Sequence, residues 1–242
     1  MKTVIIVQAR MGSTRLPGKI MKEILGQPLL FYQLERLRKV TTADDILVAT
    51  TVGGKDDIIV DFCLKQRAKY YRGSEEDVLA RYYEAARESG AEVIVRVTSD
   101  CPLIDAAVID RVIRTYKENI DKVDYVANTL VRSYPRGMDC EVFPFAVLAD
   151  IHERTFEPVD REHVTAYIYN HPDRFRLLNV AGEENLSHHR WTVDTPEDFE
   201  LIRRMIEALY PVKHDFSMGD CLDLLKHNPE WLKLNQHIKQ KA

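Results

Sequence analysis

The strongest indication of the fold lies near the start of the chain, in the stretch Val4-Ile5-Ile6-Val7-Gln8-Ala9-Arg10-Met11-Gly12-Ser13-Thr14-Arg15-Leu16-Pro17-Gly18-Lys19. Its first four residues form a short β-branched run that stops at a polar segment containing two glycines. A run of this kind predicts a strand that is buried on both faces. The polar segment that follows it predicts a functional loop at the end of that strand.

The first half of the chain repeats this pattern. Further apolar runs occupy residues 46–49 and 93–97, and segments with helical spacing of apolar residues lie at 29–37, 58–63 and 78–86. Strands that alternate with helices imply βαβ units. We therefore predict an α/β fold with a mostly parallel central sheet and helices on both of its faces.

The second half of the chain is less regular. Its expected strands are residues 124–127, 139–143, 175–180 and 190–193, and its expected helices are 144–153, 160–170, 197–209 and 217–226. No low-complexity linker separates the two halves. We therefore expect one domain over residues 1–242 that adds a mixed α+β lobe at about 124–195. Residues 210–242 form a C-terminal extension to which the sequence assigns no role.

Composition narrows the class of protein. The 242 residues are 45% hydrophobic and 30% charged, which favours a compact fold. A net charge of −4 lacks the basic excess of a nucleic-acid-binding protein, so no nucleic acid is expected as a partner. No apolar stretch approaches 18 residues, so no membrane span is expected. The four cysteines form no CxxC pair, which favours reduced thiols and a cytoplasmic location.

The loop after the first strand carries three cations within ten residues, namely Arg10, Arg15 and Lys19. Gly12 permits a close backbone approach, and Ser13 can donate a hydrogen bond. Because ligands of open α/β sheets bind beyond the carboxyl ends of the strands, this loop predicts a site for the polyphosphate of a nucleotide. It is not a Walker A loop, since five residues separate its two glycines and isoleucine follows the lysine. A solvated surface loop is the alternative interpretation.

Two aspartates follow expected strands. Asp100 comes after the run that ends at residue 98, and Asp194 comes after residues 190–193. Thr195 is expected to cap the next helix, with Pro196 as its first residue. Mg²⁺ is usually held by one or two carboxylates, with waters and substrate phosphates completing its shell. The pair therefore predicts a site for Mg²⁺, or for Mn²⁺ in its place, although each aspartate alone is also compatible with a turn or a helix cap.

A charged segment in the second half is a candidate for binding an acceptor. Arg136 precedes a glycine, and Asp139 and Glu141 lie on one face of the expected strand because side chains alternate along a strand. These side chains could bind the hydroxyl groups of a sugar. A hairpin edge stabilised by salt bridges is the alternative interpretation.

Two further candidate residues lie where the sequence predicts the start of a helix. His163 lies at an expected helix start, where its ring could bond a phosphate, a sugar or a neighbouring helix. Ser74 precedes three acidic residues and is predicted to be the N-cap of the helix that runs through Arg81.

At these motifs the chain resembles the cytidylyltransferases that activate acidic sugars, which include the CMP-Kdo and CMP-sialic acid synthetases. Its nearest likeness is to the spore coat polysaccharide biosynthesis protein F group. The resemblance extends from Val4 to about Leu209 and is carried by residues 8–19, 73–81, 100–105, 136–141, 161–163 and 193–198.

The resemblance implies a nucleotide-diphospho-sugar transferase fold, which is Rossmann-type and GT-A-like. It implies that Arg10, Lys19, Asp100 and Asp194 are catalytic, and that Asp100 and Asp194 hold the metal. The implied nucleotide-binding residues are Gln8, Ala9, Arg10, Gly12, Ser13, Arg15, Lys19 and Ser74, and the implied acceptor-binding residues are Arg136, Asp139, Glu141 and His163. The chain departs from the CMP-Kdo branch at Cys101, where that branch carries an acidic residue.

The resemblance also implies an activity. CMP would pass from CTP to an acidic nonulosonate-type sugar, with release of pyrophosphate, for the synthesis of a surface polysaccharide or glycan such as a spore coat. A homodimer is the family expectation. Two alternatives stay open from the sequence: a glycosyltransferase that uses a nucleotide-diphosphate sugar, and a nucleotide-binding module that has lost catalysis.

Overall fold

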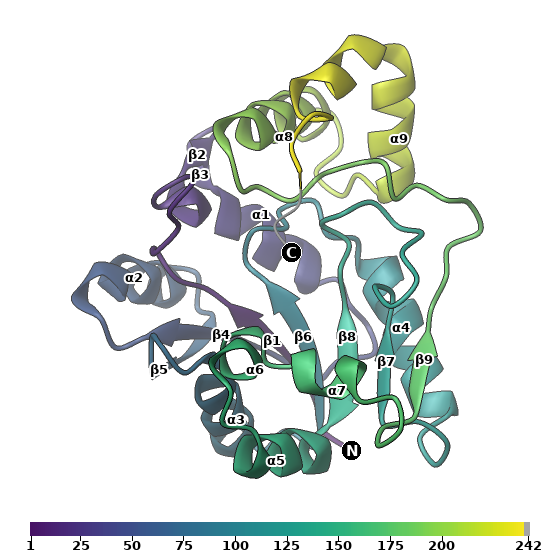
Figure 1. Cartoon of the computed structure of the whole chain (residues 1–242). Helices are drawn as coiled ribbons and strands as arrows, with labels where there is room; N and C mark the ends of the chain where they lie inside the picture. Colours follow the sequence, from purple (N-terminus) through teal and green to yellow (C-terminus); the bar gives the residue numbers. More distant parts are fainter. Residues whose placement is uncertain (240–242) are drawn as a thin grey trace.

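A seven-stranded sheet forms the centre of the computed structural model, which describes residues 1–239 (Figure 1). The strands lie in the order β5-β4-β1-β6-β8-β7-β9. Four of them, β5, β4, β1 and β6, pair in parallel, whereas β8 runs antiparallel to both of its neighbours. The predicted α/β fold with a mostly parallel sheet is confirmed. The strand bounds are β1 Thr3–Gln8, β4 Asp45–Thr51, β5 Lys69–Gly73, β6 Val93–Thr98, β7 Tyr125–Ala127, β8 Glu141–Pro144 and β9 Leu177–Asn179.

Helices cover both faces of the sheet because the central strands are apolar on both sides. In β1, Ile5 and Val7 pack toward α1, α2 and α4, whereas Val4 and Ile6 pack toward α3, α5 and α7. All four side chains are fully buried, as expected for alternating side chains of a central strand. The bounds are α1 Leu29–Leu37, α2 Asp57–Lys65, α3 Val78–Ser89, α4 Ala106–Glu118, α5 Phe145–Arg154, α6 Pro158–His163 and α7 Ala166–Asn170.

A third apolar cluster lies beyond the carboxyl ends of the strands. Helices α8 (Pro196–Leu209) and α9 (Met218–His227) pack there around the buried Trp191. The short 3-10 helix Pro229–Leu234 contacts both helices. The C-terminal extension therefore covers α8, at the top of the view in Figure 1. The remaining elements are the 3-10 helices Lys19–Met21 and Gly54–Asp56 and the two-residue strands β2 (Glu23–Ile24) and β3 (Gln27–Pro28).

The helix expected over 160–170 is divided in two. Val164 has a φ of +61° and is fully buried, and α6 ends just before it while α7 begins two residues after it. The amide of Thr165 donates a hydrogen bond of 2.6 Å to the carbonyl oxygen of His163, which closes a three-residue γ-turn. Residues 160–163 are all polar, whereas most of residues 164–169 are apolar, so the pattern changes at Val164 but does not indicate a turn with a positive φ.

Two other local expectations were wrong. Residues 190–193 form no strand in the structure, because their only ladder contact is a single parallel bridge between Arg190 and Arg136. The N-cap of α3 is Asp77, whose carboxylate accepts a hydrogen bond of 2.8 Å from the amide of Ala80. Ser74 instead accepts a hydrogen bond of 3.0 Å from the amide of Asp77 and shapes the turn before the helix.

The described part of the chain contains no helix with the length and apolar character that crossing a bilayer requires.

The four cysteines are all buried and unpaired with one another. Burial raises the pKa of the Cys63 thiol to about 12, and that of Cys221 also to about 12.

A glycine at the turn before β8 tests how closely that turn packs against the backbone of residues 191–192. Gly137 has a φ of +105°, and an added Cβ would lie 2.8 Å from the carbonyl carbon of Trp191. We expect Gly137→Ala to lower the free energy of unfolding by at least about 3 kcal/mol, because both the conformation and the backbone contact are incompatible with a side chain. Urea denaturation measures the loss.

The matched control is Gly90→Ala. Gly90 has a φ of +64° but open space around the position of the added Cβ. This control should lose only about 1–2 kcal/mol, which is the cost of the left-handed conformation alone. Equal losses in the two variants would contradict the close backbone approach at Gly137.

Candidate active site

Three segments that are far apart in the sequence meet at the carboxyl ends of the central strands. The loop that follows β1 lies beside the end of β6, because Gln8 and Thr98 are paired in the parallel register. The amide of Val193 donates a hydrogen bond of 2.8 Å to the carbonyl oxygen of Asp100. This contact places Asp194 next to Asp100, across 94 positions of sequence.

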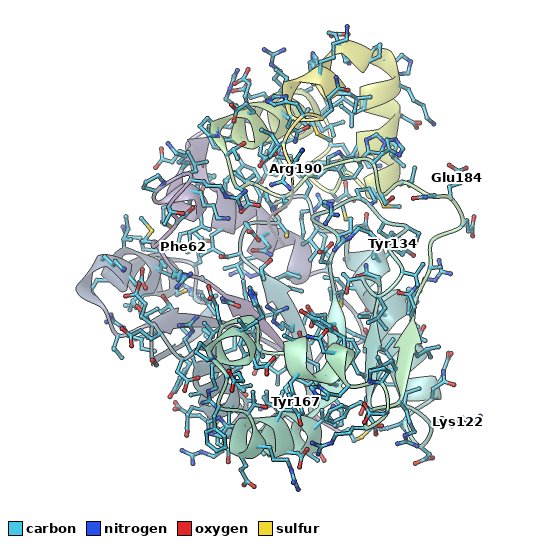
Figure 2. All side chains as sticks on the ribbon, viewed as in Figure 1. Phe62, Lys122, Tyr134, Tyr167, Glu184 and Arg190 are labelled. Atoms are coloured by element: carbon cyan, nitrogen blue, oxygen red, sulfur yellow. The ribbon has the colours of Figure 1, made fainter. Side chains whose placement is uncertain are left out.

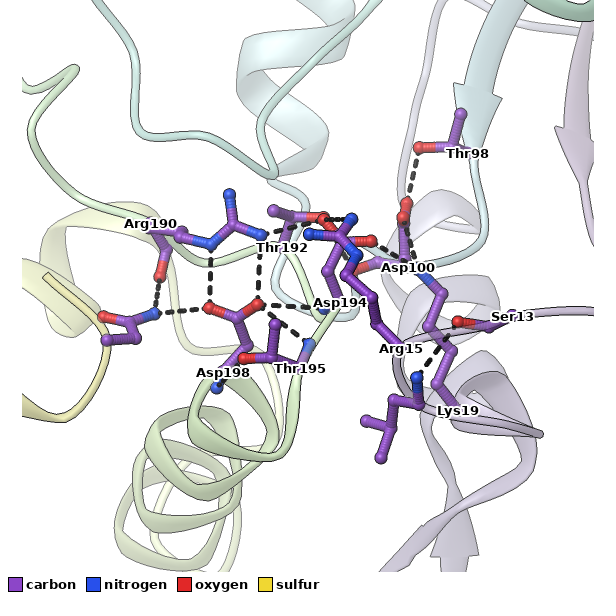
Figure 3. Close-up of polar contacts among 12 residues, drawn as sticks. Ser13, Arg15, Lys19, Thr98, Asp100, Arg190, Thr192, Asp194, Thr195 and Asp198 are labelled. Atoms are coloured by element: carbon purple, nitrogen blue, oxygen red, sulfur yellow. Dashed lines mark hydrogen bonds and ion pairs between the residues drawn. The ribbon is translucent and has the colours of Figure 1, made fainter. Parts of the chain in front are cut away.

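Lys19 lies between these two aspartates (Figure 3). Its Nζ is 2.8 Å from Oδ2 of Asp100 and 2.9 Å from Oδ1 of Asp194. Burial alone would lower the pKa of Lys19, but the two carboxylates outweigh burial and raise it above its ordinary value. Burial raises the pKa of Asp100, but the charge of the Lys19 ammonium, together with hydrogen bonds from Lys19 and Thr98, outweighs burial and lowers it. The ammonium and the Asp100 carboxylate therefore favour each other's charged form.

Asp194 gathers two further cations. The guanidinium of Arg15 lies 3.1 Å from Oδ2 of Asp194, and that of Arg190 lies 2.8 Å from the same oxygen. One carboxylate thus contacts three positive side chains. A group of this composition is suited to an anionic ligand, since phosphate oxygens can replace the carboxylate as the partners of the positive side chains.

The turn that carries Asp194 is held rigidly from behind. Thr195 caps α8 in a reciprocal capping box with Asp198, and Pro196 is the first helical residue, so both predictions are confirmed. The Asp198 carboxylate is fully buried and accepts hydrogen bonds from Arg190 and from the amide of Asp194. Helix capping and the site are therefore parts of one network.

The C-terminal extension joins this network. The side-chain amide of Asn235 donates a hydrogen bond of 2.9 Å to Asp198 and another of 2.8 Å to the carbonyl oxygen of Arg190. Arg190 lies beneath α8 near the middle of the molecule, whereas Glu184 of the preceding segment lies at the outer edge (Figure 2). Residues beyond 210 thus support the turn at Asp194.

Two cavities meet at the three segments. The first, here the loop cavity, has a volume of about 460 Å³. It is lined by Gln8, Arg10, Gly12, Ser13, Thr14, Arg15, Lys19, Thr98, Ser99, Asp100, Glu162 and Asp194. The second, here the inner cavity, has a volume of about 310 Å³. It is lined by Gln8, Arg10, Arg15, Arg96, Thr98, Asp100, Cys101, Arg132, Arg136, Gly137, Asp139, Glu162, His163, Thr192 and Asp194.

Most of the predicted site residues line these cavities, and three do not. Ala9 is fully buried in the core, where its amide donates a hydrogen bond of 3.1 Å to the carbonyl oxygen of Ala49. Ser74 lines neither cavity and belongs to the turn before α3. Glu141 lines an adjoining cavity of about 430 Å³ that shares Arg96 and His163 with the inner cavity.

The acids of the segment 136–141 are already engaged. Asp139 forms a bidentate ion pair with Arg132, at 2.6 and 2.8 Å. Glu141 forms an ion pair with Arg96 and accepts a hydrogen bond of 2.9 Å from the hydroxyl of Tyr125. These two acids therefore hold two arginines in place beside the inner cavity.

Arg136 differs from these arginines. Its side chain lines the inner cavity and forms no hydrogen bond or ion pair with any of residues 1–239. Burial lowers the pKa of Arg136, and the positive charges of Arg132 and Arg190 lower it further. The charge of Asp139 only partly offsets these effects, so the guanidinium lacks a full counter-charge, which favours an anionic ligand.

Sequence reasoning missed several residues that line the cavities. Arg96 carried a signal, since a charged side chain interrupts an otherwise buried strand. Thr98, whose hydroxyl donates a hydrogen bond of 2.6 Å to Asp100, lies at the end of the same strand. No sequence pattern indicates Arg132, because it lies before the motif 136–141 that contains its partner Asp139. Glu162 lies within the motif 161–163, in which only the histidine is predicted to be a site residue.

A fourth cavity lies elsewhere. It has a volume of about 510 Å³ and lies against α4 and α9, away from the cationic loop. None of the predicted site residues lines it, so its size alone does not make it the candidate active site.

A parallel sheet whose strand ends carry a cationic loop and a pair of aspartates is typical of nucleotide-binding α/β enzymes. Comparison of the sequence identifies the family, because the model of the cytidylyltransferase family matches residues 4–219. The chain belongs to the cytidylyltransferase family and is a CTP-dependent nucleotidyltransferase. The resemblance drawn from the motifs is confirmed.

Individual relatives agree with this assignment. The spore coat polysaccharide biosynthesis protein SpsF of Bacillus subtilis is 34% identical over 93% of this chain and 94% of its own length. A solved cytidylyltransferase from Leptospira borgpetersenii superposes with a TM-score of 0.93 at 34% identity, covering 99% of this chain and 100% of that one. CMP:2-keto-3-deoxy-manno-octonic acid synthetase in complex with CTP shares the fold, with a TM-score of 0.63 at 18% identity over 86% of this chain and 99% of that one.

The network behind Asp194 can be tested through stability. Asp198→Asn removes a buried charge that faces Arg190 and two backbone amides. We expect a loss of about 3–5 kcal/mol in the free energy of unfolding, because breaking a buried ion pair leaves its partner uncompensated. Urea denaturation provides the measurement.

Asp223→Asn on the exposed face of α9 is the control and should change stability by no more than about 0.5 kcal/mol. If the two variants unfold at the same denaturant concentration, Asp198 does not have the structural role described above.

Proposed function

We propose that this enzyme transfers CMP from CTP to an acidic nonulosonate-type sugar and releases pyrophosphate. One observation carries the proposal: a cavity lined by a cationic loop opens into a second cavity lined by arginines, and Asp100 and Asp194 lie where they join. The first cavity suits a polyphosphate and the second suits an acceptor that bears a carboxylate. The names of the relatives, among them a polysaccharide biosynthesis protein and a synthetase in complex with CTP, support the same activity.

The triphosphate of CTP would lie in the loop cavity. Arg10 lines both cavities and forms no ion pair within the described chain, so its guanidinium is available to phosphate oxygens. Arg15 and Lys19 would add two charges, and Gly12 and Ser13 line the same cavity. Charge-assisted hydrogen bonds from these groups would position the α-phosphorus beside the inner cavity.

We further propose that Asp100 and Asp194 hold Mg²⁺, with Mn²⁺ as a substitute. The donor set fits, because the two carboxylates already converge on one cation, the Lys19 ammonium. No group of three or more metal-binding side chains occurs among residues 1–239. Two carboxylates completed by phosphate oxygens and water match the usual shell of Mg²⁺. When bound, the ion would neutralise charge on the phosphates.

The acceptor would bind in the inner cavity. Arg136 is proposed to pair with the sugar carboxylate, and Asp139 and His163 to contact its hydroxyl groups. Glu141 would act from the adjoining cavity by holding Arg96. The acceptor hydroxyl then forms a bond to the α-phosphorus, and the bond from that phosphorus to the bridging oxygen breaks as pyrophosphate leaves. The protein contributes positioning and neutralisation of the developing charge.

We also propose a cytoplasmic homodimer that serves the synthesis of a surface polysaccharide, such as that of a spore coat. Two apolar side chains of the lobe support the dimer, since Phe156 is 82% exposed and Val159 is 62% exposed. Neighbouring apolar side chains at a surface are typical of an interaction site. The four unpaired, buried cysteines support a reducing compartment.

The test is release of pyrophosphate from CTP over a panel of nucleotides and of acidic keto sugars. We expect release only with CTP and only in the presence of an acidic keto sugar. Arg136→Gln should raise the KM of the acceptor about tenfold to a hundredfold, because one charge-assisted contact is worth about 1.5–3 kcal/mol. The KM of CTP should change little.

Arg111→Gln is the matched control, since Arg111 lies outside both cavities and contacts Tyr134. Its kinetics should equal those of the unaltered enzyme. Release of a nucleoside diphosphate from a nucleotide sugar, without use of CTP, would contradict the proposal and mark a glycosyltransferase.

A further inference from the structure

Three carboxylates line both the loop cavity and the inner cavity: Asp100, Asp194 and Glu162. This inference rests on the proposed function, in which an acceptor hydroxyl attacks the α-phosphorus where the two cavities meet. That hydroxyl must lose a proton, and a general base has to lie within hydrogen-bond reach of it. The residue that takes the proton is therefore sought among these three side chains.

Two of the three are already committed to cations. Asp100 and Asp194 contact the Lys19 ammonium, and Asp194 also contacts Arg15 and Arg190. Glu162 is exposed to the cavities and forms no hydrogen bond or ion pair with any side chain of residues 1–239. It is the carboxylate at the junction whose oxygens are available to a substrate.

The segment around Glu162 is fixed at both ends. On one side the Arg161 guanidinium donates a hydrogen bond of 3.0 Å to the carboxylate of Asp77, the N-cap of α3. On the other side the Thr165 hydroxyl donates a hydrogen bond to Glu141, beneath the inner cavity. The exposed carboxylate thus stands on a short, well-held element and not on a loose loop.

The backbone beside it is strained. Val164 is β-branched, fully buried and held at a φ of +61° in a γ-turn that side chains of this kind rarely adopt. Such conformations persist only where the surrounding packing determines them, and they cluster at functional sites. The turn ends α6 directly after His163, so that Glu162 and His163 both reach the inner cavity.

We propose that Glu162 is the general base of the transfer. Its carboxylate accepts the proton of the acceptor hydroxyl as that oxygen forms its bond to the α-phosphorus. The bond between the α-phosphorus and the oxygen that bridges to the β-phosphate breaks, and pyrophosphate leaves with the electron pair. The proton on Glu162 then passes to solvent, to which the side chain is exposed.

The test compares variants in the pyrophosphate assay. Glu162→Gln should lower kcat about a hundredfold to ten-thousandfold, the usual contribution of a general base. CTP affinity should not fall, because the isostere keeps the shape of the loop cavity and removes a negative charge that faces the phosphates. In Glu162→Ala, added formate should restore part of kcat, since a small carboxylate can occupy the vacated place. A merely structural role would not respond to formate.

Two neighbours provide controls. Glu157→Gln changes a carboxylate on the same lobe that lines neither cavity, and its kcat should be unaltered. His163→Gln should raise the acceptor KM with little change in kcat, because His163 lines the inner cavity only.

The outcomes separate the two proposals. If the unaltered enzyme releases pyrophosphate and the Glu162→Gln variant has the same kcat, the assignment of Glu162 is wrong but the proposed function stands. If His163→Gln loses kcat and Glu162→Gln does not, the general base is the histidine and the assignment of Glu162 is wrong. No pyrophosphate release by the unaltered enzyme with any acidic keto sugar overturns the proposed function, and the assignment with it.

Discussion

The ion pairs between the Lys19 ammonium and the carboxylates of Asp100 and Asp194 hold the candidate active site together. They join the loop after β1, the end of β6 and the turn before α8, which are separated by 81 and 94 positions of sequence. Buried charges are stable only when each is matched. The parallel pairing of β1 and β6 and the bond from Val193 to Asp100 bring the three segments within reach.

A second layer of contacts extends this arrangement into the C-terminal half. Asp194 contacts Arg190, Arg190 contacts the buried Asp198, and Asn235 bonds to both partners of that pair. The capping box of α8 uses the same Asp198 carboxylate. The C-terminal extension, to which the sequence assigned no role, thus stabilises the turn that presents Asp194 to the cavities.

Sequence patterns predicted what local chemistry determines. The run 4–7 predicted the central strand, and Thr195 with Pro196 predicted the start of α8, because both signals lie within a few adjacent residues. Tertiary contacts decided the rest. The γ-turn at Val164 is imposed by packing. In residues 190–193, the amide of Trp191 bonds to Arg136 beside the glycine turn and that of Val193 bonds to Asp100, so no strand forms. Sequence patterns do not indicate Glu162, because its place between two cavities depends on segments that lie far away in the sequence.

We propose that the Lys19 ammonium occupies the place where a divalent cation would bind between Asp100 and Asp194. The most direct measurement is the affinity of Mn²⁺ without nucleotide, for the unaltered protein and for Lys19→Met. The variant should bind Mn²⁺ about tenfold to a hundredfold more tightly, because a charge-assisted contact worth about 1.5–3 kcal/mol no longer competes. A further Asp100→Asn change should abolish the gain. Equal Mn²⁺ affinities with and without the Lys19 ammonium would show that Lys19 does not occupy the cation's place.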